Sequence, residues 1–245
     1  MSEPQPDPIR LFVGTDPQQH IAERALMASV AKNTKRPVEI TWMRQGDEGW
    51  DWGGPEAGWA TPFTLFRYHI PRACDFKGRA IYVDVDMLML GDIEELWEWD
   101  LEGKPAAATR RPEVIVWDCS KVDPSDFEGL ATSKKQSHRG YFSRKACPKI
   151  SQDWNVWDNL EAWEAGGNVC KLLHYTVLRT QPWKPYRKRF NYDIPHTCPK
   201  ACALFWEYAK LGGVSDEIRD AIVRPDHERE VSLGPVRHGG LVAKL

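Results

Sequence analysis

The sequence predicts an α/β fold of the doubly wound kind, in which one sheet is flanked by helices. Two observations lead to this expectation. Short apolar runs alternate with a segment of helical periodicity at the beginning of the chain, which is the order of a β-α-β unit. Later apolar runs at 80–83 and 114–117 continue the pattern of buried strands. Sheets of this kind bind ligands beyond the carboxyl ends of their strands, so the residues that follow these runs are the first candidates for a site.

The first β-α-β unit is expected in three consecutive segments. Residues 9–13 (IRLFV) form a short apolar run that predicts the first strand. Residues 18–32 repeat apolar side chains at helical spacing, and residues 38–43 (VEITWM) predict the second strand. This order predicts that the two strands are parallel and joined by a right-handed crossover.

Two more elements are expected before the middle of the chain. Residues 61–70 (TPFTLFRYHI) predict one helix with Pro62 in its first turn. After the strand at 80–83, Asp92 is expected to be the N-cap of a short helix, in a capping box with Glu95.

The organisation of the chain is expected to be simple. Residues 1–8 are rich in proline and acid and predict a disordered tail, and residues 9–245 predict a single domain with a helical and tail-like C-terminal part from about 190. In that part residues 201–211 predict one helix, followed by a polar tail.

The composition excludes some classes of protein. Of 245 residues, 42% are hydrophobic and 28% are charged, and the net charge is −2, which is ordinary for a globular enzyme-sized domain and not typical of a general nucleic-acid binder. No run of 18 apolar residues occurs, and the N-terminus lacks the basic and apolar segments of a signal peptide. We therefore expect a cytoplasmic protein whose six cysteines are reduced.

The strongest chemical signal is the pair Asp84 and Asp86. These residues come at the end of an apolar strand (AIYV) and precede another apolar run (MLML). In an extended chain, residues two apart point to one face, so both carboxylates could address one ligand. Two buried like charges need a positive partner, and a divalent cation such as Mg²⁺ or Mn²⁺ with hard oxygen ligands supplies it. Such ions are usually shared with substrate phosphates, so the pair predicts a metal–diphosphate site.

Several motifs together resemble family 8 glycosyltransferases, which include glycogenin and the bacterial lipopolysaccharide galactosyltransferases. The segment RAIYVDVDMLMLGDIEELWEWDLEGK is similar to the D-x-D region of that family, and TLFRYHIP to its helix with an arginine. The segment ISQDWNVWD resembles its L-P-x-x-W-N block, and LLHYTVLRTQPWKP its late H-[FY]-x-G-x-x-K-P-W motif. The resemblance implies a GT-A fold, with a single Rossmann-like mixed sheet flanked by helices.

The resemblance also implies the ligands of a manganese or magnesium ion. On the family pattern, Asp84, Asp86 and His174 hold the metal, and the metal bridges the diphosphate of a UDP-sugar donor. Histidine is a reasonable third ligand for a borderline metal ion.

Four more residues are implied as donor contacts. Thr15 and Asp16, after the first strand, match the nucleotide-base loop of the family, and Arg67 would lie near the ribose or diphosphate. At the family's phosphate-binding lysine this sequence has Gln181, and Lys184 is favoured over Arg179 as the replacement cation.

The acceptor side departs from the family. Its N-x-G motif before VIVWD is replaced by Arg111, Pro112 and Glu113, and its D-Q-D segment is not recognisable. Asp118 and Asp153 are the carboxylates nearest in sequence to these motifs and are the candidates for a catalytic side chain. Retention on this fold need not use a protein nucleophile.

The leading interpretation is a retaining glycosyltransferase, an EC 2.4 type enzyme, that transfers a hexose from a UDP-sugar to an acceptor hydroxyl. A saccharide or glycolipid acceptor is favoured, and basic runs at 134–149 and 184–189 leave nucleic acid as the alternative acceptor. Two other classes stay open. One is a metal-dependent nucleotide-sugar phosphohydrolase, and the other is a non-catalytic carbohydrate-binding protein, which the twelve tryptophans favour.

Overall fold

The centre of the molecule is a six-stranded sheet, which we analysed in a computed structural model that describes residues 6–44, 46–50, 61–128, 140–158, 169–223 and 241–242. The strands are ordered β5 (Ala106–Ala108), β6 (Val114–Asp118), β3 (Arg79–Asp84), β1 (Ile9–Thr15), β2 (Val38–Arg44) and β9 (Leu241–Val242).

The sheet is mixed. Strand β1 runs parallel to both β2 and β3, which confirms the parallel pair expected at the beginning of the chain. The outer pairs β3–β6, β5–β6 and β2–β9 are antiparallel. The central strands are buried on both faces, as their apolar sequences require.

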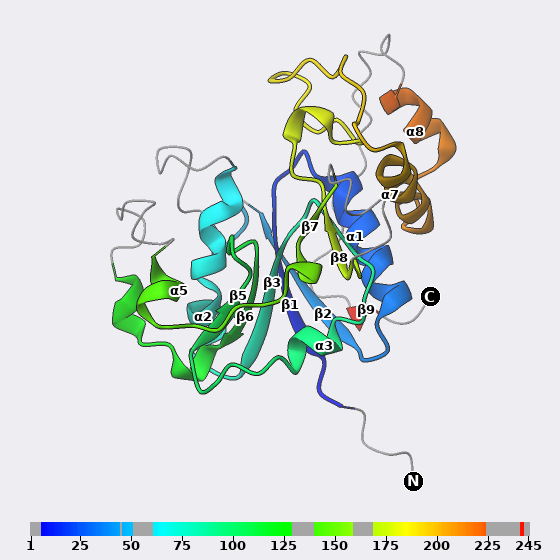
Figure 1. Cartoon of the computed structure of the whole chain (residues 1–245). Helices are drawn as coiled ribbons and strands as arrows, with labels where there is room; N and C mark the ends of the chain where they lie inside the picture. Colours follow the sequence, from blue (N-terminus) through cyan, green and yellow to red (C-terminus); the bar gives the residue numbers. More distant parts are fainter. Residues whose placement is uncertain are drawn as a thin grey trace.

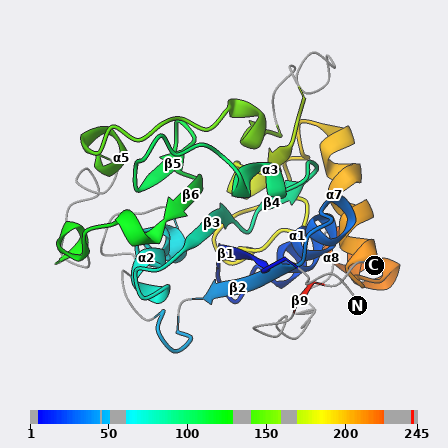
Figure 2. The same ribbon diagram turned by 90° about the horizontal axis from the view of Figure 1, so that it is seen from below.

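Helices cover both faces of this sheet. Helix α1 (His20–Asn33) connects β1 to β2 and packs on one face, with α7 (Pro199–Leu211) against its outer side, as Figure 2 shows. The 3₁₀ helix η2 (Pro62–Tyr68) and helix α2 (Ile70–Ala73) lie on the other face. The predicted strands, helix α1 and helix α7 are therefore all found where the sequence placed them.

A second sheet of three strands lies beside the first. Its order is β4 (Met87–Met89), β8 (Leu172–His174) and β7 (Val156–Trp157), with β4 antiparallel to β8. Helix α1 holds β4 through Ser29, whose Oγ accepts a hydrogen bond of 2.9 Å from the Met89 amide. This small sheet brings the end of β8 beside the turn that follows β3.

The remaining elements are short and connect the two sheets. They are α3 (Glu94–Trp97), η3 (Cys119–Lys121), η4 (Pro124–Phe127), α5 (Tyr141–Arg144), η6 (Gln152–Trp154), η7 (Leu178–Thr180) and α8 (Asp216–Val223). In Figure 1 the yellow segment after β8 and helix α8 lie at the upper end of the molecule, toward which β1 and β3 point.

Three expectations about local structure were wrong. The single helix over 61–70 is divided into η2 and α2, because Pro71 has no amide hydrogen to continue one helical ladder. Asp92 does not form a capping box: its Oδ1 accepts from the Glu94 amide, while Glu95 pairs with Lys171. The polar tail after 211 contains helix α8, whose last carbonyls accept hydrogen bonds from basic side chains of the 184–189 run.

Within the described ranges, no helix combines the length and the apolar character needed to cross a bilayer.

Candidate metal and donor site

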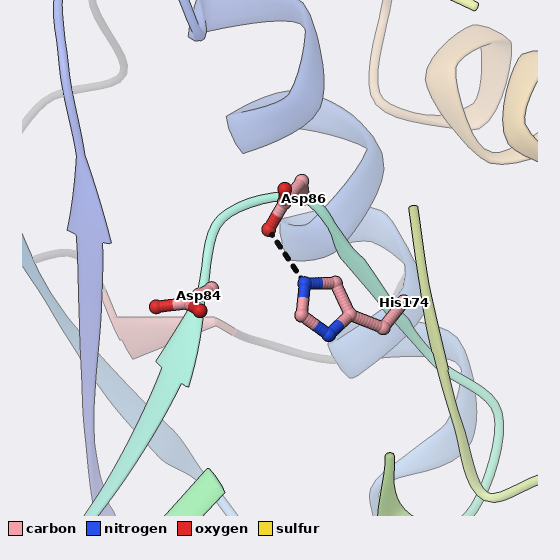
Figure 3. A group of neighbouring side chains, drawn as sticks. All are labelled: Asp84, Asp86 and His174. Carbon is pink, nitrogen blue, oxygen red and sulfur yellow. Dashed lines mark ion pairs between the residues drawn. The ribbon is translucent and has the colours of Figure 1, made fainter. Parts of the chain in front are cut away.

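Three side chains converge at the carboxyl end of β3. Asp84 is the last residue of β3, Asp86 lies in the turn that follows, and His174 is the last residue of β8 (Figure 3). Their potential ligand atoms all lie within 4.8 Å of one another, and the three residues are only 7%, 8% and 4% exposed. The structure thus brings together the three side chains that the family resemblance implied as ligands of one metal ion.

The two carboxylates converge by a different geometry from the one expected. Asp84 is in the strand, but Val85 and Asp86 form a turn between β3 and β4, so the pair does not share the face of one extended strand. Val85 is held because its amide donates to the Gly14 carbonyl at 3.1 Å, and the Asp86 carbonyl accepts from the Tyr175 amide at 2.8 Å. The turn therefore has fixed ends, and it directs the Asp86 side chain at His174, as Figure 3 shows.

The donor set fits a small divalent cation. Asp86 Oδ1 is buried and has no hydrogen-bond partner in the described part of the chain, although it lies 3.3 Å from His174 Nε2. A buried carboxylate oxygen without a partner costs free energy unless something positive binds to it. Two carboxylates and one imidazole suit Mn²⁺, and Mg²⁺ with more of its waters retained.

The electrostatics of the cluster show a buried excess of negative charge, which either a proton or a metal ion can balance. Burial and the neighbouring Asp86 raise the pKa of Asp84 against the opposing effect of Arg67, and the result is about 6. Burial lowers the pKa of His174, but Asp86, Glu113 and Asp84 outweigh it and raise the value to about 9. At neutral pH, a protonated imidazole thus balances the carboxylates where a divalent cation could do so instead.

Asp84 is held by Arg67, from the face of the sheet opposite helix α1, and by Tyr82 of its own strand. Arg67, on η2, donates from Nη2 to Asp84 Oδ1 at 2.9 Å, and its guanidinium lies 4.7 Å from the centre of the Tyr82 ring. The Tyr82 hydroxyl also donates to Asp84 Oδ1. Arg67 was expected near the ribose or diphosphate. The structure places it directly against a metal-site carboxylate, as a buried ion pair.

Asp86 is held by Gln181. The amide nitrogen of Gln181 donates to Asp86 Oδ2 at 2.9 Å and to the Tyr175 carbonyl at 2.8 Å. Both amide hydrogens are therefore used within the protein. The position at which the family has a phosphate-binding lysine instead orients a carboxylate here, which the sequence alone did not indicate.

His174 is held by two residues that sequence reasoning did not assign to the site. Its Nδ1 lies 2.8 Å from Asn155 Oδ1 and 3.5 Å from Glu113 Oε2. Asn155 also donates from Nδ2 to Glu113 Oε2 at 2.9 Å. Glu113 precedes β6, whose antiparallel pairing with β3 places Val114 beside Val83, so Glu113 lies at the edge where β3 delivers Asp84.

The nucleotide-loop candidates lie on the neighbouring strand. Gly14 pairs with Asp84 between β1 and β3, so Thr15 and Asp16 leave the sheet beside the cluster. The Thr15 hydroxyl donates to Glu23 at 2.8 Å. Asp16 accepts from the Gln18 amide at 2.8 Å and from the Tyr186 hydroxyl, and burial raises the pKa of its carboxyl.

Lys184 lies further along the segment that contains Gln181. Its Nζ is 3.3 Å from the Val223 carbonyl at the end of α8, and its amide donates to the Gln181 carbonyl at 3.1 Å. It also lines a cavity of 820 Å³ to which Gln181 contributes. Gln181 thus contributes to the lining of this cavity and also contacts the Asp86 carboxylate.

The two candidate catalytic carboxylates are not brought to the cluster. Asp118 pairs with Arg79 at the beginning of β3, roughly 17 Å along the strand from Asp84 at 3.3 Å per residue. Its carboxylate accepts from Ser120 instead. The Asp153 side chain accepts from the Ser151 hydroxyl at 3.1 Å, outside the cluster.

The structure describes only residues 46–50 of the loop after β2, and Trp50 is the one tryptophan of this loop among them. Trp50 is buried, and its ring centre lies 5.6 Å from that of Phe66. Trp52 and Trp59 lie outside the described residues. In the described part of this loop, Trp50 is therefore a packing residue.

Comparisons with known proteins agree with the fold and the motifs. Residues 56–177 match the sequence profile described as glycosyl transferase family 8. Protein CDI of Arabidopsis thaliana is 38% identical over 119 residues, which are 47% of this chain and 46% of that protein. The chain thus spans about half the length of the curated relative it matches.

Solved glycosyltransferase structures share the architecture. The apo form of GlyE from Streptococcus pneumoniae TIGR4 matches with a TM-score of 0.59 at 14% identity, over 89% of this chain and 64% of GlyE. The galactosyltransferase LgtC in complex with donor and acceptor sugar analogs matches with a TM-score of 0.57 at 15% identity, over 86% of this chain and 99% of LgtC. At these identities the likeness establishes the fold. With the family profile, it makes this chain a family 8-like member of the GT-A glycosyltransferases.

Proposed function

We propose that this protein is a retaining glycosyltransferase that transfers a hexose from a UDP-sugar to an acceptor hydroxyl with the help of a divalent metal, Mn²⁺ or Mg²⁺. The observation that carries the proposal is the buried Asp84–Asp86–His174 cluster at the carboxyl end of β3, in a GT-A fold. Asp84, Asp86 and His174 would hold the ion. When bound, the ion supplies Lewis-acid stabilisation of the departing nucleotide diphosphate.

The residues of the chain have separate roles in this proposal. Thr15 and Asp16 follow β1 and would contact the nucleotide base, beside the strand that ends in Asp84. Arg67 would keep Asp84 ionised and oriented, because the two form a buried ion pair. Lys184 would supply positive charge toward the donor phosphates from the far side of Gln181. Neither Asp118 nor Asp153 is given a catalytic role.

We propose that the acceptor is a saccharide or glycolipid with an anionic group. The cavity of 820 Å³ beside Gln181 supports this, because its lining is basic and aromatic: Lys184, Arg187, Lys188, Arg189, Tyr192 and Trp206. Cations and aromatic rings together suit a charged sugar. No comparison supports a nucleic-acid acceptor, and residues 134–139 of the other basic run lie outside the described residues.

A cytoplasmic location belongs to the same proposal. The support for it is that all six cysteines are free thiols in the structure, which agrees with a reducing compartment.

The donor half of the proposal is tested by nucleotide release. Wild type and Asp86→Ala are incubated with a panel of UDP-sugars, with Mn²⁺ or with a chelator, and released UDP is measured. We expect release of UDP from one preferred sugar, dependent on the metal and reduced about 100-fold or more in the variant. The matched control is Asp118→Asn, a carboxylate at the other end of the same sheet, which should retain wild-type activity. Metal-independent release, or equal rates in all variants, would contradict the proposal.

The acceptor half needs a separate comparison. A hexose phosphate and the matching free hexose are offered with the preferred donor to wild type and to the Lys188→Ala/Arg189→Ala double variant. We expect the variant to raise the KM for the phosphorylated acceptor and to leave that for the neutral one unchanged. A KM that does not respond to the charge of the acceptor would remove the cavity from the proposal. Release of free sugar that no acceptor increases would indicate a phosphohydrolase instead.

A further inference from the structure

Glu113 lies behind the imidazole of His174, on the side away from the two aspartates. His174 Nε2 faces Asp86 Oδ1 at 3.3 Å, whereas Nδ1 faces Asn155 at 2.8 Å and Glu113 at 3.5 Å. The three potential ligands within 4.8 Å of one another do not include Glu113. Glu113 is therefore placed to act on His174 and not on the ion itself.

Two hydrogen bonds connect Glu113 to Asn155 and Asn155 to His174, and we call these three residues the relay. Their donors and acceptors can be assigned. An ionised carboxylate can only accept, so the group of Asn155 that faces Glu113 at 2.9 Å must be its amide nitrogen. The amide oxygen of Asn155 then faces His174 Nδ1 and can only accept as well. The proton of a neutral His174 ring is thereby held on Nδ1, and the lone pair is left on Nε2, toward Asp86.

The backbone on both sides of Glu113 is held by residues that border the metal cluster. Arg67, which binds Asp84 through Nη2, donates from Nη1 to the carbonyl of Pro112, the residue before Glu113. Val114, the residue after it, is paired with Val83 in the sheet. Asn155 is 1% exposed and the side chain of Glu113 is 20% exposed, so the relay is largely shielded from water. Hydrogen bonds to a carboxylate are stronger than neutral ones, and burial strengthens them further.

We propose that Glu113, acting through Asn155, is a positioning residue that orients His174 and fixes its tautomer for metal binding. A carboxylate behind a ligating imidazole increases its basicity and holds the ring in place, and loss of such a partner typically lowers metal affinity by about 10–100-fold. The inference rests on the metal site of the proposed function.

The test measures metal binding without any nucleotide or sugar. Mn²⁺ is titrated into the full chain, free Mn²⁺ is followed by electron paramagnetic resonance, and the coupling of bound Mn²⁺ to a histidine nitrogen is read by electron spin echo modulation. We expect Glu113→Ala and Asn155→Ala each to weaken Mn²⁺ binding by about 10–100-fold and to reduce the nitrogen coupling. Glu113→Gln, which can still accept from Asn155, should keep the coupling and recover part of the affinity.

Two controls separate this role from general damage. Asp118→Asn removes a carboxylate at the other end of the same strand β6 and should bind Mn²⁺ as wild type does. Because Glu113 acts through Asn155, the double variant Glu113→Ala/Asn155→Ala should lose less affinity than the product of the two single losses. Circular dichroism and thermal melts establish that each variant is folded.

The outcomes also distinguish the relay from the metal site. If Asp86→Ala abolishes Mn²⁺ binding while Glu113→Ala and Asn155→Ala bind within twofold of wild type, the relay is refuted and the metal site stands. Single losses that multiply in the double variant would likewise refute a relay. If Asp86→Ala binds Mn²⁺ as wild type does, the proposed function fails together with the relay.

Discussion

Replacement of Arg67 by methionine tests whether the cluster depends on its buried ion pair. The guanidinium lies 2.9 Å from Asp84 Oδ1, and the two side chains are 4% and 10% exposed. Removal of one partner of a buried pair costs about 3–5 kcal/mol of folding free energy, because the other charge is left without compensation. The pKa of Asp84 is already about 6, so Asp84 can take up a proton in the variant. Protonation of Asp84 limits the loss, and we expect the free energy of unfolding to fall by about 3 kcal/mol at pH 7.

The loss of stability in Arg67→Met should depend on pH, because it depends on the ionisation of Asp84. Loss of Arg67 raises the folded-state pKa of Asp84 above about 6 and leaves the unfolded state unchanged. The difference in free energy of unfolding between wild type and variant is therefore largest above pH 6. The part of this difference that comes from the charge of Asp84 disappears as the pH falls below 6. Mn²⁺ should stabilise the variant at least as much as the wild type, because the cation replaces the lost charge.

Urea denaturation at pH 7 and pH 5, with and without Mn²⁺, measures these differences. Arg72→Met is the matched control, since Arg72 is exposed on the neighbouring helix α2 and its replacement should change stability by less than about 0.5 kcal/mol. A free energy of unfolding for Arg67→Met within about 0.5 kcal/mol of wild type at pH 7, or an equal loss at both pH values, would refute the reasoning.

Three further predictions concern the surroundings of the site. Burial lowers the pKa of His69 to about 2, so folding stability should fall as the pH drops through 6.5, by about 1.4 kcal/mol per pH unit once the pH is below about 5.5. His69→Gln should flatten this slope in urea titrations at several pH values. Gln181→Lys should tighten UDP binding in calorimetry but weaken Mn²⁺ binding, because an ammonium group beside Asp86 competes with the cation. In Gly14→Ala the new Cβ would lie 2.7 Å from the Tyr82 hydroxyl, so we expect a loss of about 1–3 kcal/mol in thermal denaturation and weaker Mn²⁺ binding.

The parallel centre of the fold follows from local sequence patterns. Residues 9–13, 38–43 and 80–83 are mostly apolar, although Glu39 is exposed. Residues 9–13 and 80–83 are apolar except for Arg10, as strands covered on both faces must be. The helix between the first two fixes their parallel direction. Because β1 and β3 end at the same edge of the sheet, the position of Asp84 beside Thr15 could be anticipated once β3 was placed.

The outer part of the site could not be anticipated in the same way. Strand β6 is antiparallel to β3, and only that direction brings its first residues, and with them Glu113, to the metal edge while it carries Asp118 away. Asp118 was a candidate because it lies close in sequence to the replaced acceptor-side motif. The antiparallel direction of β6 places Asp118 at the opposite edge of the sheet instead. Strand β8 has three residues, too few to show a period, so the position of His174 came from a motif and not from a pattern.

The charge around the cluster suggests how donor binding differs from the family pattern. On the family resemblance, Gln181 stands in place of a lysine and Glu113 adds a carboxylate to the replaced N-x-G motif, whereas Arg111 of that motif adds a cation. Gln181 has no amide hydrogen left for a phosphate, because both are donated to Asp86 and Tyr175. Arg67 is already paired with Asp84. In the proposed function, positive charge for the diphosphate would then come from the metal ion and Lys184. Binding of the nucleotide and of the ion should therefore be coupled: each should raise the affinity of the other by the same factor.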